Sequence, residues 1–127
     1  VGGPSPRDPS ARDDPAANMS AICVNRVEFH VGHHDDKLLA YCRRNSIVLQ
    51  SAPPPFCHPT PPAATVTLRT AATAHGVSVE QIALRWIAQQ DIPIIVAPTS
   101  DASDADYLRP LFNFSLTDRE MSALAAC

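Results

Sequence analysis

Short apolar runs alternate with amphipathic stretches along most of the chain. Residues 21–29 begin as a nearly continuous apolar run and then alternate, a pattern typical of a parallel strand covered on both faces. Residues 46–50 and 92–96 form two further short apolar runs. We therefore expect about three buried strands.

Helical patterns fill the intervals between these runs. The strongest lies at 77–90, where Ser78 and Gln81 form a capping box and apolar residues recur at helical spacing through Trp86. This spacing assigns Trp86 to the core. Further helices are predicted at 36–44, at 63–75, at 102–108 and from the Thr117 cap to about 126. Strands that alternate with helical crossovers predict a parallel α/β fold.

Proline is concentrated in two patches. Ten of the 13 prolines lie within residues 4–15 and 53–62. Residues 1–20 contain few large apolar side chains, so we expect a flexible segment there, followed by one domain at 21–127. The second patch predicts a loop, because consecutive prolines lack amide donors. A polyproline segment that binds an SH3-like partner is the alternative interpretation of this loop.

Charge and hydropathy exclude several functional classes. The net charge of −3 gives no basic footprint for nucleic acid, and no apolar stretch is long enough to predict a membrane span. The first residues lack the pattern of a secretory signal. We therefore expect a cytoplasmic protein whose four cysteines are reduced thiols rather than two disulfides.

Histidines and acids cluster after the first predicted strand. His30, His33 and His34 precede Asp35 and Asp36. Imidazole and carboxylate groups suit zinc or nickel, but H-x-x-H-H-D-D is not a regular zinc-binding pattern. The preferred interpretation is a solvated loop with a helix-capping acid, and no metal site is assigned.

Several segments carry longer motifs. Residues 23–30 read C-V-N-R-V-E-F-H, residues 75–86 contain H-G-V-S and Q-I-A-L-R-W, and residues 112–116 read F-N-F-S-L. They are similar, in the same order, to V-N-Q-V-E-x-H, H-x-x-S-x-x-Q-V-A-L-R-W and F-D-F-x-L of the aldo-keto reductases. Residues 38–42 and 47–51 resemble the family's helix and strand that lie between the first two motifs.

The resemblance implies a partial (β/α)8 TIM barrel, with about three parallel strands (barrel strands 6–8) and their helices. The chain of 127 residues is too short for a whole barrel, which needs roughly 200 or more. The family reduces aldehydes and ketones with NADPH. Its catalytic tyrosine, lysine, aspartate and histidine lie in the half of the barrel that this chain does not match, so no catalytic residue is assigned.

Three positions are candidates for binding NADPH by resemblance. Arg26 stands where the family places a glutamine against the nicotinamide amide. Thr99 and Ser100 lie in the segment that corresponds to the family's P-K-S, whose lysine and serine hold the ribose 2′-phosphate. Ala52 stands where the family stacks a tyrosine on the nicotinamide ring, and an alanine offers no aromatic face. We therefore expect NADPH binding by this chain to be weak.

These features lead to one functional expectation and two alternatives. The expectation is a truncated or degenerate reductase that has no activity alone. The first alternative is one part of a split reductase that another chain completes, with NADPH bound across both parts. The second is a non-catalytic protein-binding module. Because half a barrel leaves a wide apolar face, we expect self-association or a complementing chain at that face.

Overall fold

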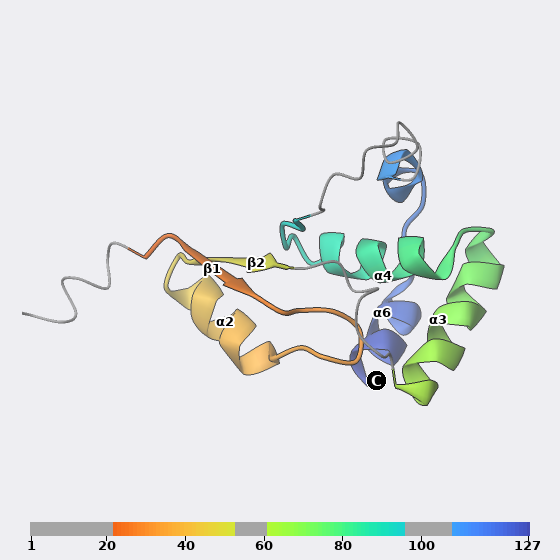
Figure 1. Ribbon diagram of the computed structural model, residues 1–127, viewed down its shortest axis with the longest axis horizontal. Helices are drawn as coiled ribbons and strands as arrows, with labels where there is room; N and C mark the ends of the chain where they lie inside the picture. The colour runs from red at the N-terminus through yellow and green to blue at the C-terminus, as the bar shows by residue number, and fades with distance from the viewer. Residues whose placement is uncertain (1–21, 53–60, 96–107) are drawn as a thin grey trace, which may run out of the picture.

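The chain folds into a β–α–β unit followed by a group of helices (Figure 1). The computed structural model describes residues 22–52, 61–95 and 108–127. The elements are β1 (Val24–Val27), α2 (Asp36–Arg44), β2 (Val48–Ser51), α3 (Pro62–His75), α4 (Val79–Ala88), the 3-10 helix η3 (Arg109–Phe112) and α6 (Asp118–Ala125). In Figure 1, β1, β2 and α2 lie at one end, and α3, α4 and α6 gather at the other. None of the helices in these ranges is long and apolar enough to cross a membrane.

The sheet within the described residues has two parallel strands rather than the predicted three. Val24 lies opposite Val48, and the register runs on to Val27 opposite Ser51. The predicted third strand, at 92–96, contributes a single parallel bridge between Ile94 and Ser51. Pro93 explains this difference, because it has no N–H to donate to a ladder and serves only as an acceptor for the Ser51 N–H, at 2.9 Å.

The first strand is also shorter than the predicted 21–29. It ends at Val27, and the chain then folds back in a tight turn. His30 and His33 pair across this turn through two backbone hydrogen bonds of 2.9 and 3.0 Å. Gly32 has a φ of 88° there, a conformation that a side chain would strain. The turn therefore replaces the end of the predicted strand.

The predicted helix ends are largely confirmed. Ser78 and Gln81 form the capping box of α4, and Thr117 and Glu120 form that of α6. Gly76 ends α3 in the left-handed conformation, with a φ of 65°. The helix predicted at 102–108 lies outside the described residues except for its last position, which η3 follows. Residues 1–20 also lie outside them.

One core joins the turn after β1 to helices α4 and α6. Trp86 is buried, and its ring stacks on Phe29 with the two centroids 5.7 Å apart. Its Nε1 donates a hydrogen bond of 3.2 Å to the Met121 carbonyl on α6. Ile82 and Leu124 are completely buried in the same cluster. The assignment of Trp86 to the core is confirmed.

Candidate functional site

The carboxyl ends of β1 and β2 bring together three residues of interest. Arg26 lies opposite Gln50 in the sheet, and Ala52 directly follows β2. The Ala52 N–H donates to the Val27 carbonyl at 3.0 Å, which extends the pairing by one residue. Active sites of (β/α)8 barrels lie at this end of the strands. The structure therefore places these residues where such a site would be built.

Ser51 fixes the strand ends from the buried side. It has no exposed surface, and its Oγ donates a 2.7 Å hydrogen bond to the Phe29 carbonyl. Its backbone N–H and C=O bind Pro93 and Ile95, respectively. One serine thus holds the chain after β1, the end of β2 and the start of the segment after α4. This arrangement fixes the position of the chain at the ends of both strands.

The side of the sheet opposite the Ser51 side chain is exposed in the described structure. Val24 and Val48 are paired and face the same way, with about half of each exposed (52% and 46%). Arg26 and Gln50 follow on the same side. We call these four residues the open face; Ile22, just before β1, is also exposed. Exposed apolar side chains gathered on one side of a sheet are typical of a surface that another part covers.

The predicted cofactor residues are only partly placed. Arg26 is exposed on the open face, whereas Thr99 and Ser100 lie outside the described residues. Ala52 is buried and carries no ring. Sequence reasoning missed Gln50, which shares the face of Arg26. The sequence did contain a signal for Gln50, because it lies two residues after Val48 and alternate residues of a strand face the same side.

The histidine cluster has a structural explanation in part. Asp35 caps α2 by accepting the Leu38 N–H at 3.0 Å, which confirms a capping acid. The expectation of a solvated loop is wrong for His30, which is buried, and for the half-buried His34. The His30 ring can be buried because its Nε2 lies 2.9 Å from a Glu28 carboxylate oxygen and its Nδ1 lies 3.0 Å from the Val31 carbonyl. No group of three metal-binding side chains forms among the residues that the structure describes.

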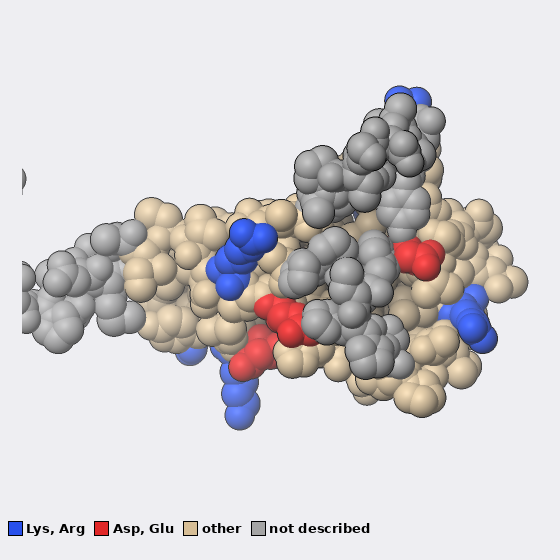
Figure 2. All heavy atoms as spheres, viewed as in Figure 1, with Lys and Arg blue, Asp and Glu red and all other residues tan. Residues whose placement is uncertain are grey.

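Cysteine chemistry and surface charge add little to this site. None of Cys23, Cys42 and Cys127 forms a disulfide, and Cys57 lies outside the described residues. Figure 2 shows basic and acidic side chains interspersed on the visible face, without a broad patch of one sign.

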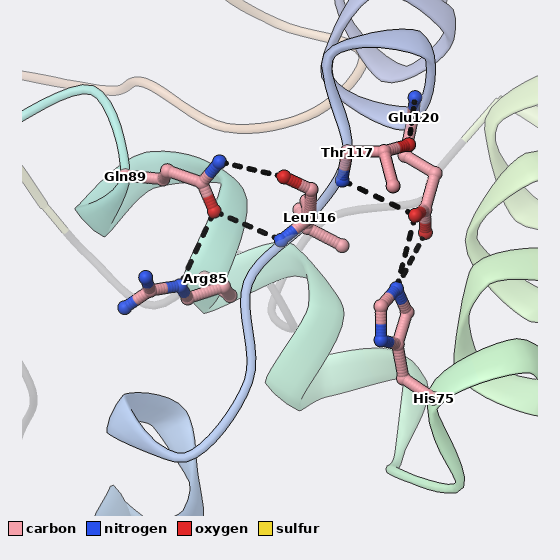
Figure 3. Close-up of polar contacts among 6 residues, drawn as sticks. All are labelled: His75, Arg85, Gln89, Leu116, Thr117 and Glu120. Carbon is pink, nitrogen blue, oxygen red and sulfur yellow. Dashed lines mark hydrogen bonds and ion pairs between the residues drawn. The ribbon is translucent and has the colours of Figure 1, made fainter.

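Arg85 of α4 and Gln89, the residue that caps the end of α4, hold η3 and the segment that follows it (Figure 3). The Gln89 amide donates to the Leu116 carbonyl at 2.8 Å and accepts the Leu116 N–H at 3.0 Å. Arg85 donates to the Leu111 carbonyl at 3.1 Å. Sequence reasoning missed this network, because the partners lie 26 or more positions apart and no periodic pattern links them.

A second contact in Figure 3 joins α3 to α6. The His75 Nε2 lies 2.8 and 3.0 Å from the two carboxylate oxygens of Glu120. Burial favours the neutral form of Glu120, but the backbone N–H of Thr117 and the His75 ring favour its anion more strongly. The pKa of Glu120 therefore lies below its usual value.

Relatives and solved structures match this chain over part of their length. No family model matches it. An NADPH-dependent codeinone reductase 1-3 of Papaver somniferum is 29% identical over 107 residues, which cover 80% of this chain and 33% of the relative. MGS-M4, an aldo-keto reductase from a deep-sea metagenome library, is 27% identical in sequence. It superimposes with a TM-score of 0.71 over 81% of this chain and 38% of its own. These matches make the chain similar to part of the aldo-keto reductases, in sequence and in fold.

The chain spans about a third of the length of the curated proteins that it matches. A second plant relative, NADPH-dependent codeinone reductase 1-5, is 27% identical over 121 residues and is covered to 36%. The thermostable aldo-keto reductase Tm1743 shares the fold, with a TM-score of 0.69, 20% identity and 39% of its chain covered. The described α/β unit thus matches one part of the barrel of the aldo-keto reductases, a family that reduces carbonyl groups with NADPH.

Proposed function

We propose that this chain supplies barrel strands 6–8 of an aldo-keto reductase fold and does not reduce carbonyl compounds by itself. The observation that carries this proposal is the open face. In a closed barrel the inward-facing side chains pack in layers that draw on strands all around the barrel. Here Val24 and Val48 keep about half of their surface exposed. The proposal takes residues 21–127 as the barrel part.

The chemistry of the strand ends supports the same proposal. Carbonyl reduction needs a hydride donor and a proton donor close to the carbonyl oxygen. The open face offers Arg26 and Gln50 at this end of the sheet, and Ala52 provides no ring to stack on a nicotinamide. Tyr41, the tyrosine in the described ranges, lies on α2 and is partly exposed. Within the described ranges, the strand ends therefore offer no tyrosine as a proton donor.

A titration with NADPH tests this proposal directly. The full chain is mixed with NADPH, and the fluorescence of the reduced nicotinamide is followed, with an intact aldo-keto reductase as the positive control. We expect no saturable change at micromolar concentrations. Saturable micromolar binding by the unaltered chain, or turnover of an aldehyde, would show that the unit is competent alone and would overturn the proposal.

A split reductase is the second candidate function, and the open face favours it as well. In this version another polypeptide supplies the remaining strands, and NADPH binds across the two parts. Size-exclusion chromatography of the chain, alone and mixed with strands 1–5 of an aldo-keto reductase, tests this candidate. Association should be lost in Val24→Lys, on the open face, and retained in Val66→Lys, on the exposed side of α3. A stable monomer in both samples would exclude both self-association and completion through this face.

A further inference from the structure

A groove lies between helices α3 and α6, and none of the residues of the open face lines it. Its volume is about 320 Å³. The lining residues recur along α3 at 66–67, 70–71 and 74, and along α6 at 119–120 and 123–124, so each helix contributes one of its faces. Small-molecule sites occupy roughly 300–1,000 Å³, and this groove is at the lower end of that range.

The surface of the groove is mainly apolar. Ala71 and Leu124 line it and are buried, so they form its floor. Ala74 and Ala123 line it from the two helices and are exposed. Val66 adds an apolar edge, with 66% of its surface exposed. The groove therefore suits the apolar body of a small ligand.

The hydroxyl groups of the groove are already used within the protein. The Thr70 Oγ1 donates to the Val66 carbonyl at 3.0 Å, and the Thr67 Oγ1 donates to the Ala63 carbonyl at 3.1 Å. The Thr67 Oγ1 also accepts from the Cys127 Sγ at 3.6 Å. Neither hydroxyl proton is left to orient a ligand, so a polar head must be held elsewhere.

Two charged side chains of α6 line the groove, and they differ in their partners. The carboxylate oxygens of Glu120 lie 2.8 and 3.0 Å from the His75 Nε2, and Oε1 also accepts the Thr117 N–H at 3.2 Å. Arg119 is exposed and forms no hydrogen bond or ion pair within the described ranges. The guanidinium of Arg119 is therefore the charged group that a ligand can engage.

The position of Arg119 in its helix also favours an anion. Arg119 lies in the first turn of α6, directly after Asp118. The backbone N–H groups at the start of a helix give that end a partial positive charge. A bound anion would be attracted by the guanidinium and by this end of the helix. Of the neighbouring acids, Asp118 does not line the groove and Glu120 is paired with His75.

We propose that the groove between α3 and α6 binds a small amphipathic carboxylate, with its apolar body in the groove and its carboxylate on Arg119. A guanidinium can donate two parallel hydrogen bonds to one carboxylate, which fixes the orientation of the head. The charge complementarity of one unpaired cation with one anion defines the head, and the apolar lining defines the body. This site does not depend on the proposed function, because it shares no residue with the strand ends.

A titration of the isotope-labelled full chain with octanoate, followed through its backbone amide signals by NMR, tests this proposal. We expect saturable shifts of signals from α3 and α6, with a dissociation constant of about 1 mM. Octanamide has the same apolar body without the charge, and it should bind about three- to fivefold more weakly, as expected for an exposed ion pair.

Two pairs of variants separate the head from the body. Arg119→Gln should weaken octanoate binding about three- to fivefold and leave octanamide binding unchanged. Arg69→Gln, which removes an exposed arginine of α3 outside the groove, should change neither. Ala74→Leu fills the groove and should abolish binding of both compounds. Ala125→Leu, at an exposed position of α6 outside the groove, should retain it.

Three results would overturn the proposal. The first is an absence of saturable shifts in α3 and α6, or shifts confined to β1 and β2, which would place the ligand on the open face. The second is equal affinity of the unaltered chain for octanoate and octanamide. The third is binding that survives Ala74→Leu. If that variant does not fold, Ala123→Leu fills the groove from α6 and decides the same question.

Discussion

Gln89 provides a sharp test of how the chain after η3 is held. In the variant Gln89→Ala, the amide that bonds both the N–H and the carbonyl of Leu116 is lost. The Arg85 Nε also loses its 3.3 Å hydrogen bond to the Gln89 Oε1. Leu116 is buried, so its two backbone groups would be left with poor access to water. The cost is therefore the desolvation of unpaired groups rather than the exchange of one partner for another.

The expected loss of stability follows from the backbone N–H and C=O of Leu116. A buried donor or acceptor left without a partner costs about 1–3 kcal/mol. Since Gln89 is itself half-buried and water can reach part of the site, we expect a total loss of about 2–3 kcal/mol in the free energy of unfolding. With a urea m-value of roughly 1.5 kcal/mol/M, the unfolding midpoint should fall by about 1.3–2 M.

Urea unfolding followed by tryptophan fluorescence measures this loss, because Trp86 is the single tryptophan and lies in the core. Gln90→Ala is the matched control. Gln90 lies just after α4, and its side chain donates a 2.8 Å hydrogen bond to the Trp86 carbonyl in α4 rather than to Leu116. This control should lose only about 0.5 kcal/mol. If both variants lose the same amount, the Gln89–Leu116 pairing contributes nothing specific and the reasoning fails.

Three further predictions concern turns, caps and acid stability. Gly32→Ala should cost more than about 2 kcal/mol, because a Cβ there combines a positive φ with a 2.9 Å approach to the Pro61 ring. Gly76→Ala, where φ is 65° but the space is open, should cost about 1 kcal/mol, and equal losses in urea unfolding would contradict this explanation. Ser78→Ala should cost about 1 kcal/mol through loss of the α4 cap, and no shift of the midpoint would exclude that role. Because the folded-state pKa of Glu120 is lowered, its stabilisation is complete above its unfolded pKa and is lost as the pH falls through the lower folded value. Acid unfolding should therefore be less steep in Glu120→Gln, and an unchanged acid profile would refute this contribution.

The parts of the fold that depend on residues close together in the sequence were predictable. The capping boxes of α4 and α6 each lie within four positions, so their chemistry is visible without the fold. The third strand was overestimated because apolar periodicity does not register the missing N–H of Pro93. The contact between His34 and Ala125 spans 91 positions and exists only once the core has formed. Long-range polar contacts of this kind leave no local pattern to find.

The candidate site, too, was predictable only where its features are local in the sequence. The resemblance to the aldo-keto reductases identified Arg26 within a motif and Ala52 after a strand. The structure adds that both residues lie at the carboxyl end of the sheet. That Gln50 shares the face of Arg26 follows only once the register of β1 and β2 is known. The open face was expected from the missing strands, but which side chains it exposes depends on the pairing of Val24 with Val48.

The distribution of buried groups explains how part of a barrel can hold a defined fold. Two strands of four residues offer few hydrogen bonds and leave one face in water, so the sheet alone would be marginal. The stacking of Trp86 on Phe29 and the burial of Leu124 connect the strand ends to α4 and α6 instead. Stability in this unit therefore resides in the helices and in the Ser51 anchor. The open face, where Val24 and Val48 remain about half exposed, contributes little to it.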